Sequence, residues 1–168
     1  ILIISKKELR LIILNIKLYS KLDTRRLTQP VKDIEKLQQL VSTTGEPLII
    51  EAVSRQVSEL PLHIRRDVTF IGEFLSQIVV HGDAVVQFID AKIIQPIKTR
   101  YTVIMAEDFV GSLSIERSKI MIAPKVKDAA LAGIGGGCNE LLISDSYIQG
   151  GIFYTKQLNL KGEVIFDS

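Results

Sequence analysis

The chain is poor in cysteine, net charge and long apolar runs, and each shortage argues against a class of protein. Its single cysteine, Cys138, excludes an internal disulfide framework and a multi-cysteine zinc site, which favours a reducing, cytoplasmic setting. A net charge of +2, from 21 basic and 19 acidic residues, lacks the strong field of dedicated nucleic-acid-binding proteins. Basic residues between Lys6 and Lys17 interrupt the only candidate for a membrane span of roughly 20 residues. We therefore expect a soluble protein with no membrane span.

The chain is long enough for one sizeable core. Its 168 residues are 46% hydrophobic, which fits one domain or two small ones. Two patterns of apolar residues divide the chain, and we predict a mainly helical region at residues 1–61 and a β-rich domain at residues 62–168. The expected fold class is α+β.

Helical spacing marks the first of these regions, although segment 8–18 fits a helix and a strand alike. Pro30 suits the first turn of a helix that extends to Gly45, because the apolar residues that follow it form one stripe. A second helix is predicted from Glu46 to Pro61. The two would form an amino-terminal helical hairpin.

Short runs of β-branched and aromatic residues, separated by turn residues, mark the second region. We expect at least seven strands, including those at 68–71, 78–80, 101–105 and 157–166. The segment 124–137 interrupts them and is predicted to be a small-residue loop or a helical turn. Such short strands fit a right-handed β-helix, a small barrel or a sandwich, and periodicity does not separate these alternatives.

A repeated pattern carries a resemblance to known families. Its strings are Gly82-Asp-Ala-Val-Val-Gln-Phe-Ile-Asp-Ala-Lys-Ile, Asp145-Ser-Tyr-Ile-Gln-Gly-Gly-Ile and Lys161-Gly-Glu-Val-Ile165. Across residues 67–166 they resemble rungs of the right-handed β-solenoids of bactofilins, of the flagellar assembly protein A family and of the carboxy-terminal domain of the division inhibitor MinC. The copies are unevenly spaced, whereas a regular solenoid advances steadily. The resemblance implies a structural, self-associating element without catalytic residues, so no site residue is transferred.

The last strand-like stretch offers a surface for self-association. A stack of strands ends in unpaired backbone groups that must be capped or must pair with another chain. The predicted hairpin could cap one end, whereas the other end carries four apolar residues, Leu158, Leu160, Val164 and Phe166. A strand paired within the core is the alternative interpretation. We expect a structural or scaffolding protein that forms homo-oligomers through its β-rich domain.

A metal-dependent, nuclease-like enzyme is a contrasting hypothesis. Carboxylates that bind Mg²⁺ and a lysine that steadies the attacking water could come from Glu73, Asp83, Asp90 and Lys92. Asp83 and Asp90 are too close in sequence for the hairpin that usually brings such groups together. Solvated charges at strand ends are the simpler interpretation, so we expect no catalytic site and no cofactor.

The histidines and the cysteine allow a second chemical hypothesis. Cys138 follows a glycine-rich stretch and could act as a nucleophile if His81 approached it. A buried, unreactive thiol is the simpler interpretation. His63, His81 and Asp83 are too few for a metal site that needs three or four ligands, so we expect none.

A helix-turn-helix regulator of DNA is the third alternative. Residues 38–60 would form the motif, with Gly45 in its turn. Phosphate contacts would then come from Arg55, Arg65 and Arg66. The β-rich domain would serve this regulator as a dimerisation or ligand-binding domain.

Overall fold

The structure is a computed structural model that describes residues 23–27, 30–96, 100–123, 133–136, 140–152 and 156–167. These ranges contain one helix, and all their strand pairs are parallel. The elements are β1 (Asp23–Leu27), α2 (Pro30–Val41), β2 (Leu48–Val57), β3 (Leu62–Ile64), β4 (Val68–Leu75), β5 (Ile78–Val80), β6 (Val85–Gln95), β7 (Val103–Met105), β8 (Ser112–Glu116), β9 (Lys119–Ile122), β10 (Gly133–Gly136), β11 (Glu140–Gln149), β12 (Gly151–Ile152) and β13 (Leu158–Asp167). The predicted β-rich body is confirmed.

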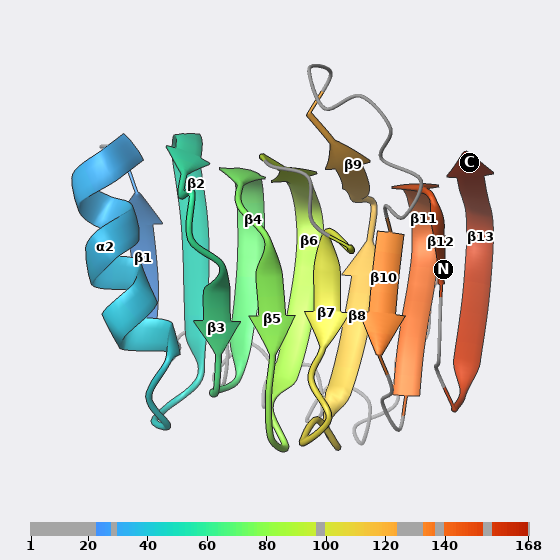
Figure 1. The fold of residues 1–168 in the computed structure, drawn as a ribbon, viewed down its shortest axis with the longest axis horizontal. Helices are drawn as coiled ribbons and strands as arrows, with labels where there is room; N and C mark the ends of the chain where they lie inside the picture. The colour runs from blue at the N-terminus through green and yellow to red at the C-terminus, as the bar shows by residue number, and fades with distance from the viewer. Residues whose placement is uncertain are drawn as a thin grey trace, which may run out of the picture.

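The strands form two sheets between which the chain alternates. The larger sheet has the order β1-β2-β4-β6-β8-β11-β13, with β9 pairing with both β6 and β11, and the smaller has the order β12-β10-β7-β5-β3. In the chain, α2 lies between β1 and β2. Later strands of the larger sheet are separated by a strand of the smaller one, except β8 and β9, which follow each other directly. Figure 1 shows the result, in which the elements follow one another in chain order from α2 at one end to β13 at the other.

Alternating side chains hold neighbouring strands of the larger sheet in register. One column of register partners is fully buried and consists of Ile50, Phe70, Phe88, Ile115 and Ile143. The separation in sequence between partners varies, since Leu113 pairs with Leu141 and Leu141 pairs with Leu158. The uneven spacing of the sequence repeat therefore reflects connections of different length between the strands, and the register of the buried partners is kept.

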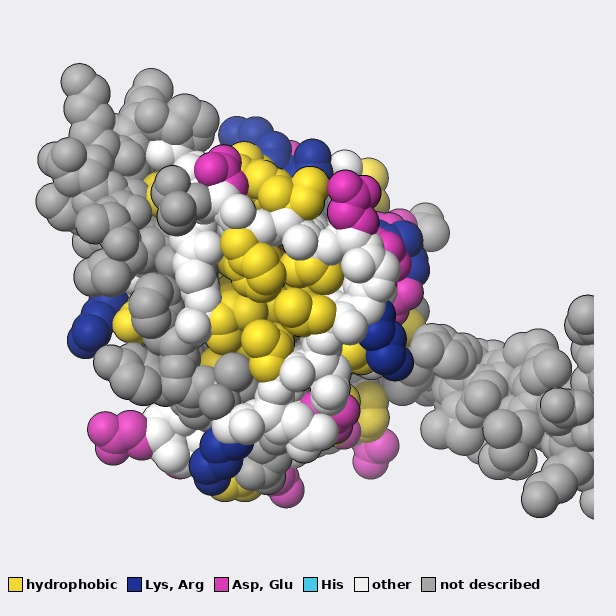
Figure 2. All heavy atoms as spheres, turned by 90° about the vertical axis from the view of Figure 1, so that its right-hand side faces the viewer, with side chains coloured by type: hydrophobic (Ala, Val, Ile, Leu, Met, Phe, Trp, Pro, Cys, Tyr) yellow, Lys and Arg dark blue, Asp and Glu magenta, His cyan; other side chains and the backbone are white. Residues whose placement is uncertain are grey.

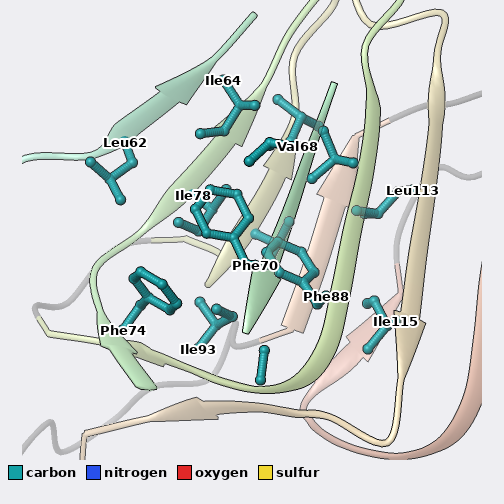
Figure 3. Packing of buried hydrophobic residues seen from close by; sticks show 14 of the residues in the cluster. Leu62, Ile64, Val68, Phe70, Phe74, Ile78, Phe88, Ile93, Leu113 and Ile115 are labelled. Atoms are coloured by element: carbon teal, nitrogen blue, oxygen red, sulfur yellow. The ribbon is translucent and has the colours of Figure 1, made fainter. Parts of the chain in front are cut away.

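Strands of the larger sheet bend around this core. Phe70 and Phe74 lie four positions apart on β4, which on a straight strand would separate them by about 13 Å. Their rings nevertheless meet edge to face, with centroids 5.2 Å apart, because the strand turns at Gly72, whose φ is +98°. A Cβ at Gly72 would overlap the carbonyl oxygen of Ala52, so this corner requires glycine. Both rings lie among the core side chains of Figure 3.

The corner recurs on later strands with other residues. Asp90, Arg117 and Asp145 have positive φ angles of 47–49°. Each follows directly after one of the register partners Ile89, Glu116 and Ser144, so the three corners lie at the same level of the sheet. Inside the corner, the Ser118 hydroxyl accepts a hydrogen bond from the Ala91 N–H, and the Ser146 hydroxyl accepts one from the Ser118 N–H, both at 3.0 Å. The two serines are buried, so these bonds satisfy amide groups at the bend that would otherwise lack partners.

The predicted second helix of the hairpin is wrong, because residues 48–57 form β2. Leu48 and Ile50 are buried in alternation and pair with Val68 and Phe70, so sheet packing overrides the helical spacing that is also present. Without that helix, no helix-turn-helix forms at residues 38–60. The predicted boundary between residues 61 and 62 falls between β2 and β3, and the pairing of β2 with β4 crosses it.

Several other elements match their predictions. The first helix is confirmed as α2, although it ends at Val41, before Gly45. Each of the four segments predicted above contains strand residues, and β4 continues past the predicted end at residue 71 to Leu75. Segment 8–18 lies outside the described residues. Gly133–Gly136, predicted as part of a loop or helical turn, instead forms strand β10. Glycine is needed there because a Cβ at Gly135 would overlap the ring of Tyr101.

Candidate functional site

Among the described strands, one edge of the larger sheet is open at β13. This strand pairs with β11 along its length, and it is the last strand of the sheet in the part of the chain that the structure describes. Backbone N–H and C=O groups along the other edge of such a strand are a template for pairing with another chain. The end of the sheet is therefore a candidate surface for association.

Side chains of β13 expose core positions at this end. Three residues of β13 pair with buried residues of β11 but are themselves exposed to solvent. They are Leu158 (41% exposed, opposite Leu141), Leu160 (49%, opposite Ile143) and Phe166 (43%, opposite Ile148). Val164 is half-buried and packs against the core. In Figure 2, which faces this end, an apolar patch lies at the centre, and charged side chains lie towards the rim. The four residues predicted for self-association thus lie together on one strand at the end of the core.

Opposite charges flank the corner of β13. Lys161 and Glu163 are exposed on either side of Gly162, whose φ is +64°. The register with β11 shifts here, and the Glu163 N–H donates a hydrogen bond of 3.2 Å to Oδ1 of Asp145. This bulge fixes where the strand bends and where its two charges lie.

A second contact between β11 and β13 lies after the corner. The Tyr147 hydroxyl donates a hydrogen bond of 2.6 Å to Oδ2 of Asp167. This bond raises the pKa of Tyr147, because the carboxylate holds the phenolic proton, and desolvation and the negative charge of Asp167 act in the same direction. The interaction links β13 to the strand beneath it beyond the bulge.

The other end of the sheets carries α2. Leu37 and Val41 on the helix are buried at 2% and 0% exposure in the core cluster, and Leu40 packs against it. The Arg65 N–H donates to the carbonyl oxygen of Val41 at 2.8 Å, which ties the carboxyl end of the helix to the residue after β3. The apolar residues in the second half of α2 are therefore packed within the chain.

Three of the predicted nuclease-like residues lie in one surface hollow, which is also lined by Arg55, Arg117 and Lys119. Glu73 forms an ion pair with Arg55, and the Lys92 amino group lies 3.8 Å from Oε1 of the same Glu73. Asp90 forms a two-point ion pair with Arg117, at 2.9 and 3.2 Å. Each carboxylate in the hollow is thus held by a cation rather than left to bind a metal ion.

The remaining chemical candidates are not brought to this hollow. Asp83 is exposed in the turn before β6 and does not line it. Cys138 lies outside the described residues. Within the described ranges, no three histidine, cysteine, aspartate or glutamate residues form a cluster that could hold a metal ion.

The arginines predicted to bind phosphates have separate surroundings. Arg55 lines the hollow, which Arg65 and Arg66 do not. Arg65 lies 3.5 Å from the carboxylate of Asp108. Arg66 donates to the carbonyl oxygens of Leu40 and Glu46, and so it satisfies backbone groups near the end of α2.

A chain of titratable side chains was missed by the sequence reasoning. His81 Nδ1 lies 3.1 Å from Oδ1 of Asp108, and His81 Nε2 lies 2.9 Å from Nδ1 of His63. Burial lowers the pKa of His63, and the positive charges of His81 and Arg65 lower it further. Desolvation acts to raise the pKa of Asp108, but the hydrogen bond and charge of His81, with the charge of Arg65, leave it lowered. Sequence proximity had pointed to Asp83 as the partner of His81.

Comparison of the chain with protein-family models, with curated proteins and with solved structures found no match. Among the described residues, no helix has the length and hydrophobicity to cross a membrane, and α2 has only 12 residues.

Proposed function

We propose that this chain is a structural or scaffolding protein that works through association of its β-rich body with a second copy. The observation that carries the proposal is the coincidence, on β13, of an open strand edge with exposed core positions. Each feature alone attracts a partner strand, and together they supply backbone pairing and apolar burial at one place.

The architecture that we infer for this body is a β-helix. Three observations support it: the alternation of the chain between two sheets, the parallel pairing throughout, and the columns of register partners that persist through chain of uneven length. In such a stack each layer contacts only its neighbours, so the terminal layer must be covered by something else. A cytoplasmic setting, inferred from the single cysteine, completes the proposal.

The residues of β13 are complementary to a second β13 strand, which favours another copy of this chain as the partner at the open edge. If two β13 strands pair antiparallel about a two-fold axis at Gly162, Leu158 faces the partner's Phe166 and Leu160 faces the partner's Val164. Lys161 then faces the partner's Glu163, so opposite charges meet twice. A two-fold register centred one residue earlier or later would place Lys161 against Lys161 or Glu163 against Glu163.

The geometry of the corner is compatible with this register. Because β13 bends at Gly162, an axis through the corner exchanges the segment before the bend with the segment after it, and core positions meet core positions. At the opposite end Leu37 and Val41 of α2 are already buried. We therefore propose a closed dimer joined at its β13 ends.

Size-exclusion chromatography with light scattering, over a hundredfold range of concentration, tests the proposal on the full chain. We expect the mass to rise from one chain to two and then to stop. Leu160→Asp should abolish the dimer, because it places a charge in the apolar contact. Association of this variant at the strength of the unchanged protein would overturn the proposal.

Charge reversals test the register separately. Lys161→Glu or Glu163→Lys alone places like charges opposite each other twice and should raise the dissociation constant about tenfold. The double exchange restores opposite charges and should restore the affinity, whereas Lys36→Glu on α2 is the control for net charge. Unchanged dimers in both single variants would overturn the register and leave self-association standing.

A further inference from the structure

The surface hollow on the outward side of the larger sheet has a small-residue floor and one irregular wall. It is a shallow hollow, open to solvent, with a volume of about 520 Å³, and its lining includes Ala52, Gly72 and Ala91. Ala52 pairs with Gly72 and Gln56 with Phe74, so residues 53–55 of β2 lie opposite Glu73 alone. Such a bulge redirects side chains, and here it brings Arg55 to the rim of the hollow.

Positive charge is in excess along this hollow. Four cations, Arg55, Lys92, Arg117 and Lys119, line it together with two carboxylates, Glu73 and Asp90. Both arginines are held in ion pairs, and Lys92 shares Glu73 with Arg55. Lys119 forms no ion pair with any residue that the structure describes.

The two lysines are direct register partners on adjacent strands. Lys92 on β6 pairs with Lys119 on β9, which places their backbones about 4.8 Å apart on one face. Like charges directly opposite each other destabilise a sheet. A bound phosphate would remove this repulsion, and it would offset the positive charge that remains in the lining after Arg117 has paired with both Asp90 and Glu116.

We propose that the hollow binds a small molecule that carries a phosphate group, with the phosphate between the amino groups of Lys92 and Lys119. The volume lies within the roughly 300–1,000 Å³ of small-molecule sites. The rest of the molecule lies over the floor and against Val53, an apolar residue of the bulge that is 62% exposed. This site is independent of the self-association surface.

Phosphorus NMR titration of inorganic phosphate, at constant ionic strength, tests the site on the full chain. We expect saturable binding that Lys92→Gln and Lys119→Gln each weaken about tenfold, since a hydrogen bond to a charged group is lost. Lys36→Gln, at an exposed position on α2, should leave the affinity unchanged. Binding that does not saturate, or that falls equally in the Lys36 variant, would overturn the proposal.

Two further measurements exclude a structural role and a polymeric ligand. In phosphate-free buffer of low salt, Lys119→Gln should keep or raise the midpoint of thermal unfolding, because repulsion of Lys92 is relieved. A lower midpoint would make Lys119 a structural residue and overturn the assignment. A short single-stranded oligonucleotide should bind no more tightly than phosphate per phosphate group, and tighter, lysine-dependent binding would overturn the choice of a small molecule.

Discussion

The two ends of the sheets solve the same problem in opposite ways. At the α2 end, where β1 is the last strand of the larger sheet, the helix packs on the core beside β2 and β3 with side chains such as Val41, which is fully buried. At the β13 end, the equivalent core position on the last strand is Leu160, which is 49% exposed. A stack of strands has to end twice, and this chain contributes its own cover at one end only within the described residues. The uncovered end is where we place the partner.

Truncation of one leucine at each end should give the largest contrast. Leu37→Ala removes a side chain that is 2% exposed and should lower the free energy of unfolding by about 2–5 kcal/mol. Leu160→Ala should cost less than about 1 kcal/mol in the monomer, because water already contacts the side chain. Urea unfolding at a concentration below the dimer range measures both. Equal losses would show that the two ends are covered alike.

A methyl group added at one glycine near each end gives a smaller contrast. At Gly162, φ is +64° and a Cβ would overlap Oδ1 of Asp145, so alanine should destabilise the monomer by about 1–2 kcal/mol. At Gly45, the Cβ would lie 2.7 Å from Nη2 of Arg66, so the guanidinium has to shift against its hydrogen bonds to Leu40 and Glu46, and the cost should be about 0.5–1 kcal/mol. Thermal and urea unfolding of the two variants compare the corner of β13 with the turn after α2. A larger loss at Gly45 would contradict this account of the corner.

Acidification should act on the α2 end, and we expect this effect to be the smallest. The backbone N–H of His63 donates to Oε1 of Gln38 on the helix, which places the imidazole beside α2, and the pKa of the imidazole is lowered in the folded protein from its usual 6.5. Unfolded chains therefore bind more protons there, so the contribution of His63 is complete above pH 6.5 and declines as pH falls towards the folded-state pKa. Urea midpoints between pH 7.5 and 5.5 should fall, and His63→Gln should flatten the decline. The same decline in the variant would exclude His63 as its source.

The fold could be predicted from sequence where local pattern and tertiary packing agree. Turn residues on both sides of Ile78–Val80 and apolar alternation in Leu158–Asp167 indicated strands, and both are strands. Leu48–Val57 failed because its apolar residues fit helical and alternating spacing alike, and only pairing with β4 decides between them. Gly135 gave no signal of a strand, because its need for glycine comes from the ring of Tyr101, over thirty residues earlier.

The candidate surfaces divide along the same line. The apolar residues of β13 could be predicted, because the open edge and the exposed positions both belong to one continuous segment. By contrast, the pairing of His81 with Asp108 depends on how far the chain travels between successive strands, which no local pattern encodes. The hollow likewise needs the register of Lys92 with Lys119, and their separation in sequence reveals nothing of it.

Pairing only with neighbouring strands also determines how such a molecule comes apart. Because β13 pairs with β11 alone among the described strands of the larger sheet, it can detach without breaking the pairing that joins β2, β4, β6 and β8. Local unfolding of β13 is then the least costly fluctuation at that end, and it leaves β11 as the new edge strand, which can unfold next. A partner bound at β13 would prevent this strand from detaching, so assembly would also slow unfolding that begins at this end.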